Sequence, residues 1–166
     1  MHKVLVGAAV LVSGLLFCCP QVEASDDIWP KAGFTEWESE IEPIIPAYIL
    51  TDEEKDNLMR LGTLEGGETD PVAIAHVIQV VLNRVDSEVF PGTVNEVIFQ
   101  KKPIQFTTAR MLAKANVTDA AEEALQAVIM GKYKDNEALY FESLQGKIWE
   151  KYYTYLFSYG GHDFYK

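Results

Sequence analysis

Residues 71–85 constrain the fold of this chain more than any other segment. Asp70 and Pro71 begin a helix there, because Asp is a strong N-cap residue and Pro is favoured at the first helical position. The helix extends to about residue 85 and is apolar on most of its sides, through Val72, Ile74, Ala75, Val77, Ile78, Val81, Leu82 and Val85. A helix that is apolar nearly all round must be surrounded by other elements. We therefore expect a fold built around this helix.

A second helix precedes it and begins at a capping box. Thr51 and Glu54 have the spacing at which each side chain binds the other residue's free backbone amide. Gly66 and Gly67 end the helix, as glycines commonly do. The apolar positions that continue the helical spacing between these two ends are Leu58, Leu61 and Leu64.

The rest of the sequence predicts more helix than strand. Thr93 and Glu96 form another capping box. Helical patterns follow at residues 93–100, 106–115 and 119–130, and short β-like stretches at residues 139–141 and 163–165. We expect a mainly α domain of the α+β class, with one small sheet or β-hairpin.

The first residues have the order of a secretory signal peptide. A positive start at Lys3 precedes an apolar run, and Val22-Glu23-Ala24 supplies a small-x-small cleavage site. The apolar run is shorter than the roughly 20 residues that a membrane-spanning helix needs. We expect residues 1–24 to be a signal peptide, with no stable membrane span, and the protein to be secreted or in the cell wall. Residues 25–47, acidic and containing proline, are interpreted as a spacer before a domain at residues 48–166.

The net charge of −11 excludes several classes of partner. Such a chain is repelled by nucleic-acid phosphates and by anionic membrane surfaces, so we expect neither as a partner. Both cysteines, Cys18 and Cys19, lie in the predicted signal peptide, so no thiolate remains to bind metal. His76 and His162 do not have the spacing of a known metal motif. We therefore expect no metal and no cofactor.

Glu65 is the residue best suited to acid–base chemistry. It lies four positions after Leu61 and seven after Leu58, which places it on the apolar face of the predicted helix. Partial desolvation there, and the negative end of the helix dipole, both disfavour an ionised carboxylate. A carboxyl group that keeps its proton can act as a general acid. On position alone, however, a solvent-exposed Glu at a helix end is the commoner case.

Six short blocks occur in a fixed order between residues 50 and 166. They are Glu65-Gly66-Gly67-Glu68, Val81-Leu82-Asn83-Arg84-Val85, Phe90-Pro91-Gly92-Thr93-Val94, Val97-Ile98-Phe99-Gln100 with Gln105-Phe106, Ala138-Leu139-Tyr140-Phe141, and Gly161-His162-Asp163-Phe164-Tyr165. The ordered set resembles the SleB-like cell wall hydrolase family, which includes spore cortex-lytic enzymes of germination. Each block alone has little specificity, whereas the order of all six is specific.

The resemblance implies a compact, lysozyme-like, largely helical fold and a lytic transglycosylase that acts on peptidoglycan glycan strands. By this resemblance Glu65 protonates the glycosidic oxygen between N-acetylmuramic acid and N-acetylglucosamine. Its carboxylate then takes the proton of the muramic C6 hydroxyl as a 1,6-anhydro ring closes, and no metal is required. Cortex and vegetative peptidoglycan remain alternative substrates, and plain hydrolysis remains an alternative reaction. The spacer has no recognisable peptidoglycan-binding repeat, so targeting by a partner protein is a further expectation.

Five other residues in the matched blocks are candidates for the substrate cleft: Gln105, Tyr140, His162, Tyr165 and Asn83. The flat apolar faces of the two tyrosines suit sugar rings. The asparagine has the alternative role of fixing the fold by hydrogen bonding, and the glutamine and histidine are as often structural as functional. We place His76 and Gln79 on a solvated edge of the central helix.

A non-catalytic wall-binding module with the same fold is the alternative function. Glu68 and Asp70 are near enough in sequence to serve as a second carboxylate, but Asp70 is better explained as a helix cap. A protease or amidase has little support, because no cysteine survives export and the serines lie in no nucleophile motif.

Overall fold

The computed structural model describes residues 45–102, 104–146 and 148–166. The predicted signal peptide, and the predicted spacer up to residue 44, lie outside the described residues. Ala47, at the end of that spacer, is already packed, because its backbone N–H donates to the carbonyl of Ile129 at 2.7 Å. The packed domain therefore begins no later than Ala47.

Three of the helices begin at the caps that the sequence predicts, Thr51, Asp70 and Thr93. The helices are α1 (Asp52–Gly66), α2 (Pro71–Val85), α3 (Val94–Ile98), the 3-10 helix η1 (Thr107–Lys114) and α4 (Asp119–Ile129). Thr51 and Glu54 make both hydrogen bonds of the capping box at α1. The Asp70 carboxylate accepts from the N–H groups of Val72 and Ala73 and so caps α2. These local bonds satisfy backbone donors that a helix leaves free at its start.

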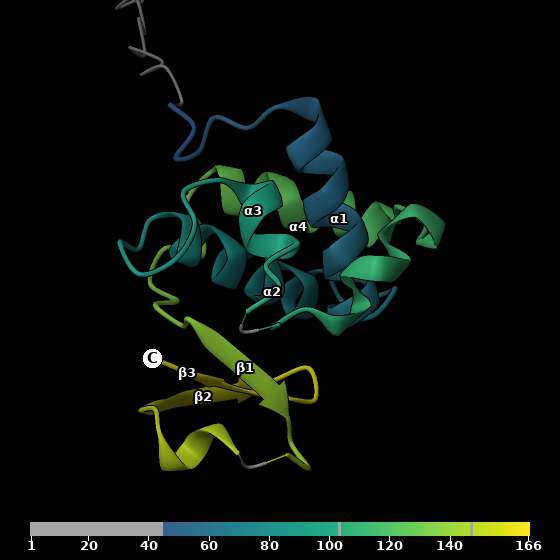
Figure 1. Cartoon of the computed structure of the whole chain (residues 1–166). Helices are drawn as coiled ribbons and strands as arrows, with labels where there is room; N and C mark the ends of the chain where they lie inside the picture. Colours follow the sequence, from purple (N-terminus) through teal and green to yellow (C-terminus); the bar gives the residue numbers. More distant parts are fainter. Residues whose placement is uncertain (1–44, 103, 147) are drawn as a thin grey trace, which may run out of the picture. The chain divides into compact units, whose positions relative to one another are not determined.

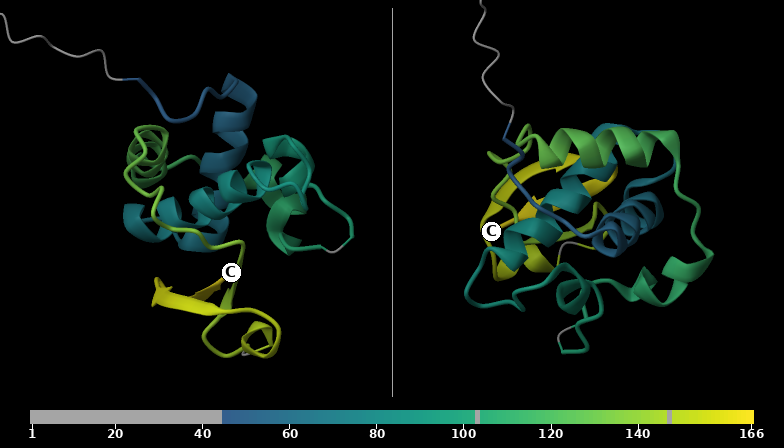
Figure 2. Two further views of the ribbon diagram at one scale, coloured as in Figure 1. Left: turned by 90° about the vertical axis from the view of Figure 1, so that its left-hand side faces the viewer. Right: turned by 90° about the horizontal axis from the view of Figure 1, so that it is seen from above.

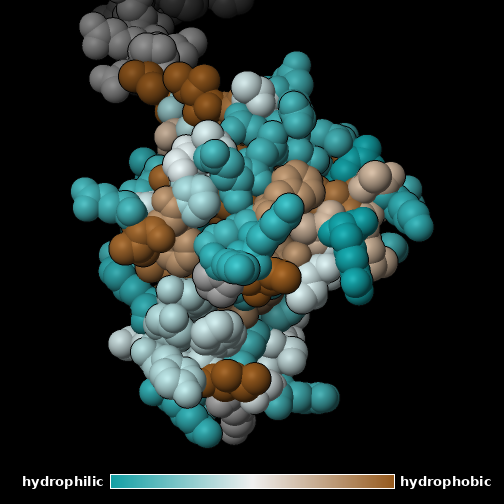
Figure 3. Space-filling view, in the orientation of Figure 1, coloured by the Kyte–Doolittle hydropathy of each residue, from teal (hydrophilic) through white to brown (hydrophobic). Residues whose placement is uncertain are grey.

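Helix α2 occupies the middle of the helical part, as its apolar composition predicts. It packs against α1, α3 and α4, and Figure 1 shows these helices gathered around it. The fully buried apolar residues of α2 are Ile74, Ala75, Val77, Ile78, Val80 and Val81. They belong to one core cluster that also includes Leu58, Leu61, Val97, Leu125, Val128, Phe141 and Phe164. On the face seen in Figure 3, the hydrophobic surface is divided into separate patches by polar residues.

A three-stranded antiparallel sheet lies on one side of the helices (Figure 2). Its strands are β1 (Tyr140–Ser143), β2 (Tyr155–Tyr159) and β3 (His162–Tyr165), in the order β1-β3-β2. A 3-10 turn, η2 (Trp149–Lys151), lies between β1 and β2. Strands β1 and β3 match the two predicted β-like stretches, whereas β2 was not expected from the sequence.

The sheet is fixed to the helices at the β2–β3 turn. Gly160 in this turn has a φ of 57°, and a Cβ atom there would lie 2.7 Å from the Cβ of Ala73 in α2. Only glycine allows this left-handed turn to approach the helix so closely. The turn therefore seats the beginning of β3 against the first turn of α2. The fold is mainly α with a small antiparallel sheet, as predicted.

Candidate active site

Glu65 lies in the last turn of α1, where two glycines bring α1 against α2. A Cβ at Gly66 would be 2.8 Å from both the backbone N and the Cα of Ile74. A Cβ at Gly62, one turn earlier, would be 2.6 Å from the Cγ2 of Ile74. Gly66 therefore lets α1 rest on the backbone of α2, and Gly62 lets it rest on the Ile74 side chain. This packing holds the end of α1, and with it Glu65, in a defined position.

The Glu65 carboxylate has one hydrogen bond. The Thr108 hydroxyl, from η1, donates to its Oε1. Among the described residues, its Oε2 has no hydrogen-bond partner, and no Lys, Arg or His forms a salt bridge with it. The side chain is half-buried. It is therefore a positioned acid with one oxygen available to a ligand.

His162 brings the start of β3 near this carboxylate. Burial lowers the pKa of His162, and the negative charge of Glu65 partly opposes that shift. The ring makes an edge-to-face contact with Phe141 of β1, with 5.1 Å between ring centroids. The imidazole is thus favoured in its neutral form near Glu65 at neutral pH, where it does not compete for the carboxylate as a cation.

Gln105 links the strand β1 residue Phe141, which contacts His162, to the buried side chain of Arg84. Its Nε2 donates to the carbonyl of Phe141 at 3.4 Å, and its Oε1 accepts from the Nη2 of Arg84 at 2.6 Å. The segment from Gln105 to Thr108 therefore joins Arg84 to Glu65. Sequence reasoning selected Gln105 but did not identify Thr108 or Arg84 as parts of the site.

Tyr140 forms an aromatic platform with two residues that the sequence did not single out. Its ring stacks on Tyr153, with centroids 3.9 Å apart and planes 27° apart, and Trp149 lies 5.5 Å away. Burial, reinforced by Tyr153, raises the pKa of Tyr140 to about 12, so its hydroxyl stays protonated. These rings line a cavity of about 200 Å³ together with Arg84 and Gln105. The density of aromatic residues near the C-terminus was the sequence signal for this cluster.

Tyr165 does not reach this cavity. It is 1% exposed, and its hydroxyl donates to the Oε1 of Glu142 at 3.1 Å. The same carboxylate accepts the N–H groups of Ile148 and Trp149. In this structure Tyr165 therefore supports the loop that carries Trp149, and a sugar has no access to its ring.

Asn83 also makes internal contacts. Its Nδ2 donates to the carbonyls of Asn136 and Ala138, and its Oδ1 accepts from the Nε2 of Gln79. These bonds fix the chain just before β1 to the end of α2, which is the fold-fixing alternative considered for this residue.

The predicted solvated edge for His76 and Gln79 was wrong. Gln79 is fully buried and donates to the Tyr48 hydroxyl at 2.9 Å. His76 is half-buried among four aromatic rings, those of Tyr133, Phe157, Tyr159 and Phe164. The β2–β3 sheet and the segment after α4 cover this side of α2, and no local sequence pattern indicates that they do.

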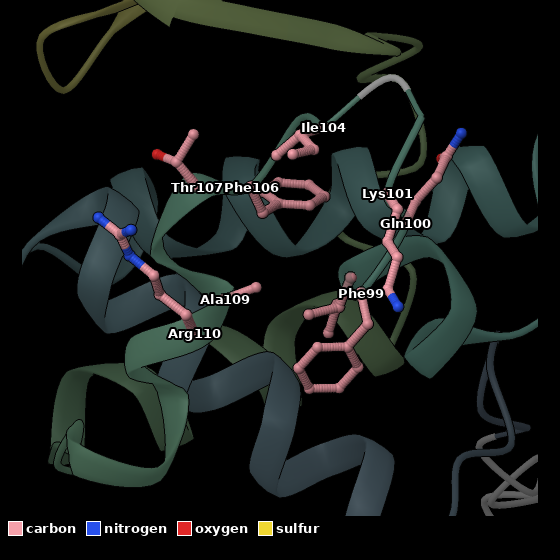
Figure 4. A pocket seen from close by; sticks show the side chains of 9 residues that line it. Phe99, Gln100, Lys101, Ile104, Phe106, Thr107, Ala109 and Arg110 are labelled. Atoms are coloured by element: carbon pink, nitrogen blue, oxygen red, sulfur yellow. The ribbon is translucent and has the colours of Figure 1, made fainter.

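A separate apolar cavity of about 310 Å³ lies between α3 and η1. Figure 4 shows Phe99, Ile104 and Phe106 lining it, with Arg110 at one side. No group of three or more potential metal ligands occurs among residues 45–102, 104–146 and 148–166. Over the same residues no helix has both the length and the apolar character needed to cross a membrane.

With this geometry established, comparisons with known proteins become informative. The sequence profile of a family described as cell wall hydrolase matches residues 68–165, which is more than half of the chain. The chain belongs to the cell wall hydrolase family. Glu65 lies three residues before the matched range, which begins at Glu68 in the turn between α1 and α2.

Solved structures place this cell wall hydrolase among the SleB-like members. One is the catalytic domain of the germination-specific lytic transglycosylase SleB from Bacillus anthracis, with a TM-score of 0.58 and 26% identity over 70% of this chain and 97% of that domain. Another is the catalytic domain of the Bacillus cereus SleB protein, with the same TM-score and identity over 75% of this chain and 97% of that domain. No curated protein matches the sequence significantly. The cell wall hydrolase therefore has the fold of a SleB catalytic domain.

Proposed function

We propose that this cell wall hydrolase cleaves peptidoglycan between N-acetylmuramic acid and N-acetylglucosamine as a lytic transglycosylase, with Glu65 as its single catalytic acid and base. The observation that carries the proposal is the Glu65 carboxylate, which is half-buried and oriented by the Thr108 hydroxyl. The likeness to the Bacillus anthracis protein, described as a germination-specific lytic transglycosylase, supports the reaction type. A wall substrate also supports export, as expected from the N-terminal residues.

The reaction has two proton transfers. Protonated Glu65 gives its proton to the glycosidic oxygen, and the bond from that oxygen to muramic C1 breaks. The Glu65 carboxylate then removes the proton of the muramic C6 hydroxyl while the C6 oxygen forms a bond to C1. The proton returns to Glu65, the 1,6-anhydro ring closes and no water is consumed. Thr108 keeps one carboxyl oxygen fixed during both steps.

The neighbouring acids do not favour a two-carboxylate mechanism. A retaining glycosidase needs a second carboxyl group about 5–5.5 Å from the first, available to attack the sugar. Asp70 is engaged in capping α2, and Glu68 is exposed on the turn between α1 and α2. His162 and Gln105 are proposed instead as neutral contacts to the sugar, and the Tyr140 platform as a surface on which a ring stacks.

The test is mass spectrometry of the fragments released from purified cortex and vegetative peptidoglycan. Glu65→Gln should lower the release rate at least about a hundredfold, because it removes the general acid. Glu68→Gln, a neighbouring exposed carboxylate, is the matched control and should retain activity. Anhydromuramyl products from the parent protein support the proposal.

Other outcomes would replace parts of the proposal. Products with reducing muramic ends would keep Glu65 as the acid but change the reaction to hydrolysis. No release from either substrate by a folded protein that still binds glycan would favour the wall-binding module.

A further inference from the structure

Arg84 is a buried cation without an acidic partner. It is 1% exposed, its Nε donates to the carbonyl of Leu139 at 2.7 Å, and its Nη2 donates to Gln105. Burial lowers the pKa of Arg84 to about 10, so the guanidinium is still charged at neutral pH. No carboxylate forms a salt bridge with it and no acceptor binds its Nη1 within the described part of the chain. Its charge faces the aromatic rings of Phe90, Phe106 and Tyr140 and is not neutralised by an anion among the described residues.

The surroundings of Arg84 leave room for such an anion. The guanidinium lies 4.8 Å from the ring centre of Phe90 and 5.3 Å from that of Tyr140. It lines the same cavity of about 200 Å³ as Trp149 and Tyr153. The cavity thus combines a guanidinium with aromatic walls, which suits a carboxylate carried on a short apolar group.

This cavity is close to the proposed catalytic acid. Gln105 binds Arg84, and Thr108, three residues later, binds Glu65. Even a fully extended chain covers at most about 11 Å in three residues. One substrate molecule can therefore contact both places.

We infer that the Arg84 cavity binds a free carboxylate of the substrate and is a specificity subsite beside Glu65. The inference rests on the proposed peptidoglycan substrate. Free carboxylates, at the ends of stem peptides or on muramic residues whose stem peptide has been removed, distinguish this polymer from uncharged amino-sugar chains. Arginine recognises them with charge-assisted hydrogen bonds. Because the domain is acidic overall, a single enclosed cation provides local recognition rather than general attraction.

Binding can be measured on the unaltered protein, which avoids any folding defect of an Arg84 variant. The sequence contains three arginines, Arg60, Arg84 and Arg110. In protein labelled with ¹⁵N at arginine, the variants Arg60→Lys and Arg110→Lys assign the three Nε–H signals. The probes are N-acetylmuramic acid, for the lactyl carboxylate, and an acetylated peptide ending in D-alanine, for the stem carboxylate. The methyl amide of each probe is the uncharged control.

The Arg84 signal should shift with at least one acid and not with its amide, while the other two signals stay in place. The acid that causes the shift identifies the source of the carboxylate. An unmoved Arg84 signal with both acids, or equal shifts with acids and amides, would overturn the inference.

Cleavage provides the second measurement. Converting the carboxylates of purified peptidoglycan to methyl amides should lower kcat/KM of the parent protein about tenfold, the effect of losing one charge-assisted hydrogen bond. Arg84→Lys, if it folds, should lose this discrimination. Equal cleavage of amidated and untreated polymer would overturn the subsite and leave the role of Glu65 intact. If the parent protein does not cleave even the untreated polymer, while the Arg84 signal still shifts with an acid probe, the proposed reaction is rejected instead.

Discussion

At the scale of single residues, the position of Glu65 depends on a partner that is distant in the sequence. Thr108 lies 43 positions away and donates the one hydrogen bond that the carboxylate receives among the described residues. The hydroxyl fixes Oε1, and Oε2 has no hydrogen-bond partner among the same residues. A threonine at the start of a weakly helical stretch gives no sequence signal of this role, because only the packing of η1 against α1 creates it.

Thr108→Val should lower kcat about tenfold with little change in KM. The substitution keeps the shape of the side chain and removes a hydrogen bond to a carboxylate, and one such bond corresponds to about tenfold or more in rate. Steady-state kinetics on soluble glycan fragments measures this. Thr108→Ser, which keeps the hydroxyl, is the control and should stay within about threefold of the parent. A valine variant as active as the serine variant would refute the positioning role.

At the scale of elements, the sequence predicts features that depend on local contacts better than features that depend on distant ones. Thr51, Asp70 and Thr93 are caps whose partners lie within three residues, so the sequence predicts where α1, α2 and α3 begin. Strand β2 pairs only with β3 and is interrupted by an irregularity between Tyr155 and Phe157, so its alternation is broken. His76 looks polar in the sequence, but rings from β2, β3 and the segment after α4, far along the chain, bury its side of α2.

The contact of α1 with α2 makes a prediction about Gly66. Gly66→Ala should destabilise the protein by about 1–3 kcal/mol, because the added methyl group meets backbone atoms of α2 that cannot rotate away. Chemical unfolding monitored by circular dichroism measures the free energy. Gly92→Ala is the control, since nothing lies within 4 Å of a Cβ there, and it should change stability by less than about 0.5 kcal/mol. Equal stabilities of the two variants would contradict the close packing.

At the scale of the whole molecule, the site combines the end of α1, the start of η1 and the start of β3. The six sequence blocks indicate which residues belong to the domain, and they include Glu65, Gln105, Tyr140 and His162. They do not separate residues that face the cavity from residues that support it, which is why Tyr165 and Asn83 are selected together with Tyr140. That distinction depends on which side of each strand or helix is covered, and this is a property of the assembled fold.

The global stability should depend on pH through two histidines. Burial lowers the pKa of His76, opposed in part by Asp70, and burial likewise lowers the pKa of His162. The unfolded chain, with His near 6.5, therefore binds protons more readily than the folded protein. The contribution of the two histidines to the free energy of unfolding is therefore complete above about pH 6.5. It decreases as the pH falls below that value. Urea unfolding at several pH values between 8 and 5 measures the slope.

The variant His76→Phe separates the two contributions. It keeps an aromatic ring among Tyr133, Phe157, Tyr159 and Phe164 and removes one titrating group. Its unfolding free energy should decrease less than that of the parent between pH 7 and pH 5. A slope identical to that of the parent would mean that His76 binds protons equally well in the folded and unfolded states.

The order of the sheet has a consequence for biosynthesis. Strand β3 is central in space, yet it follows β1 and β2 in the sequence, and those two strands do not pair with each other. A nascent chain emerges N-terminus first, so neither β1 nor β2 has its partner until residues 162–165 have left the ribosome. The helices, with Glu65 already in place, can form before then. The β2–β3 turn and His162 join them only when the last strand of the domain has emerged, so the proposed catalytic centre is completed last.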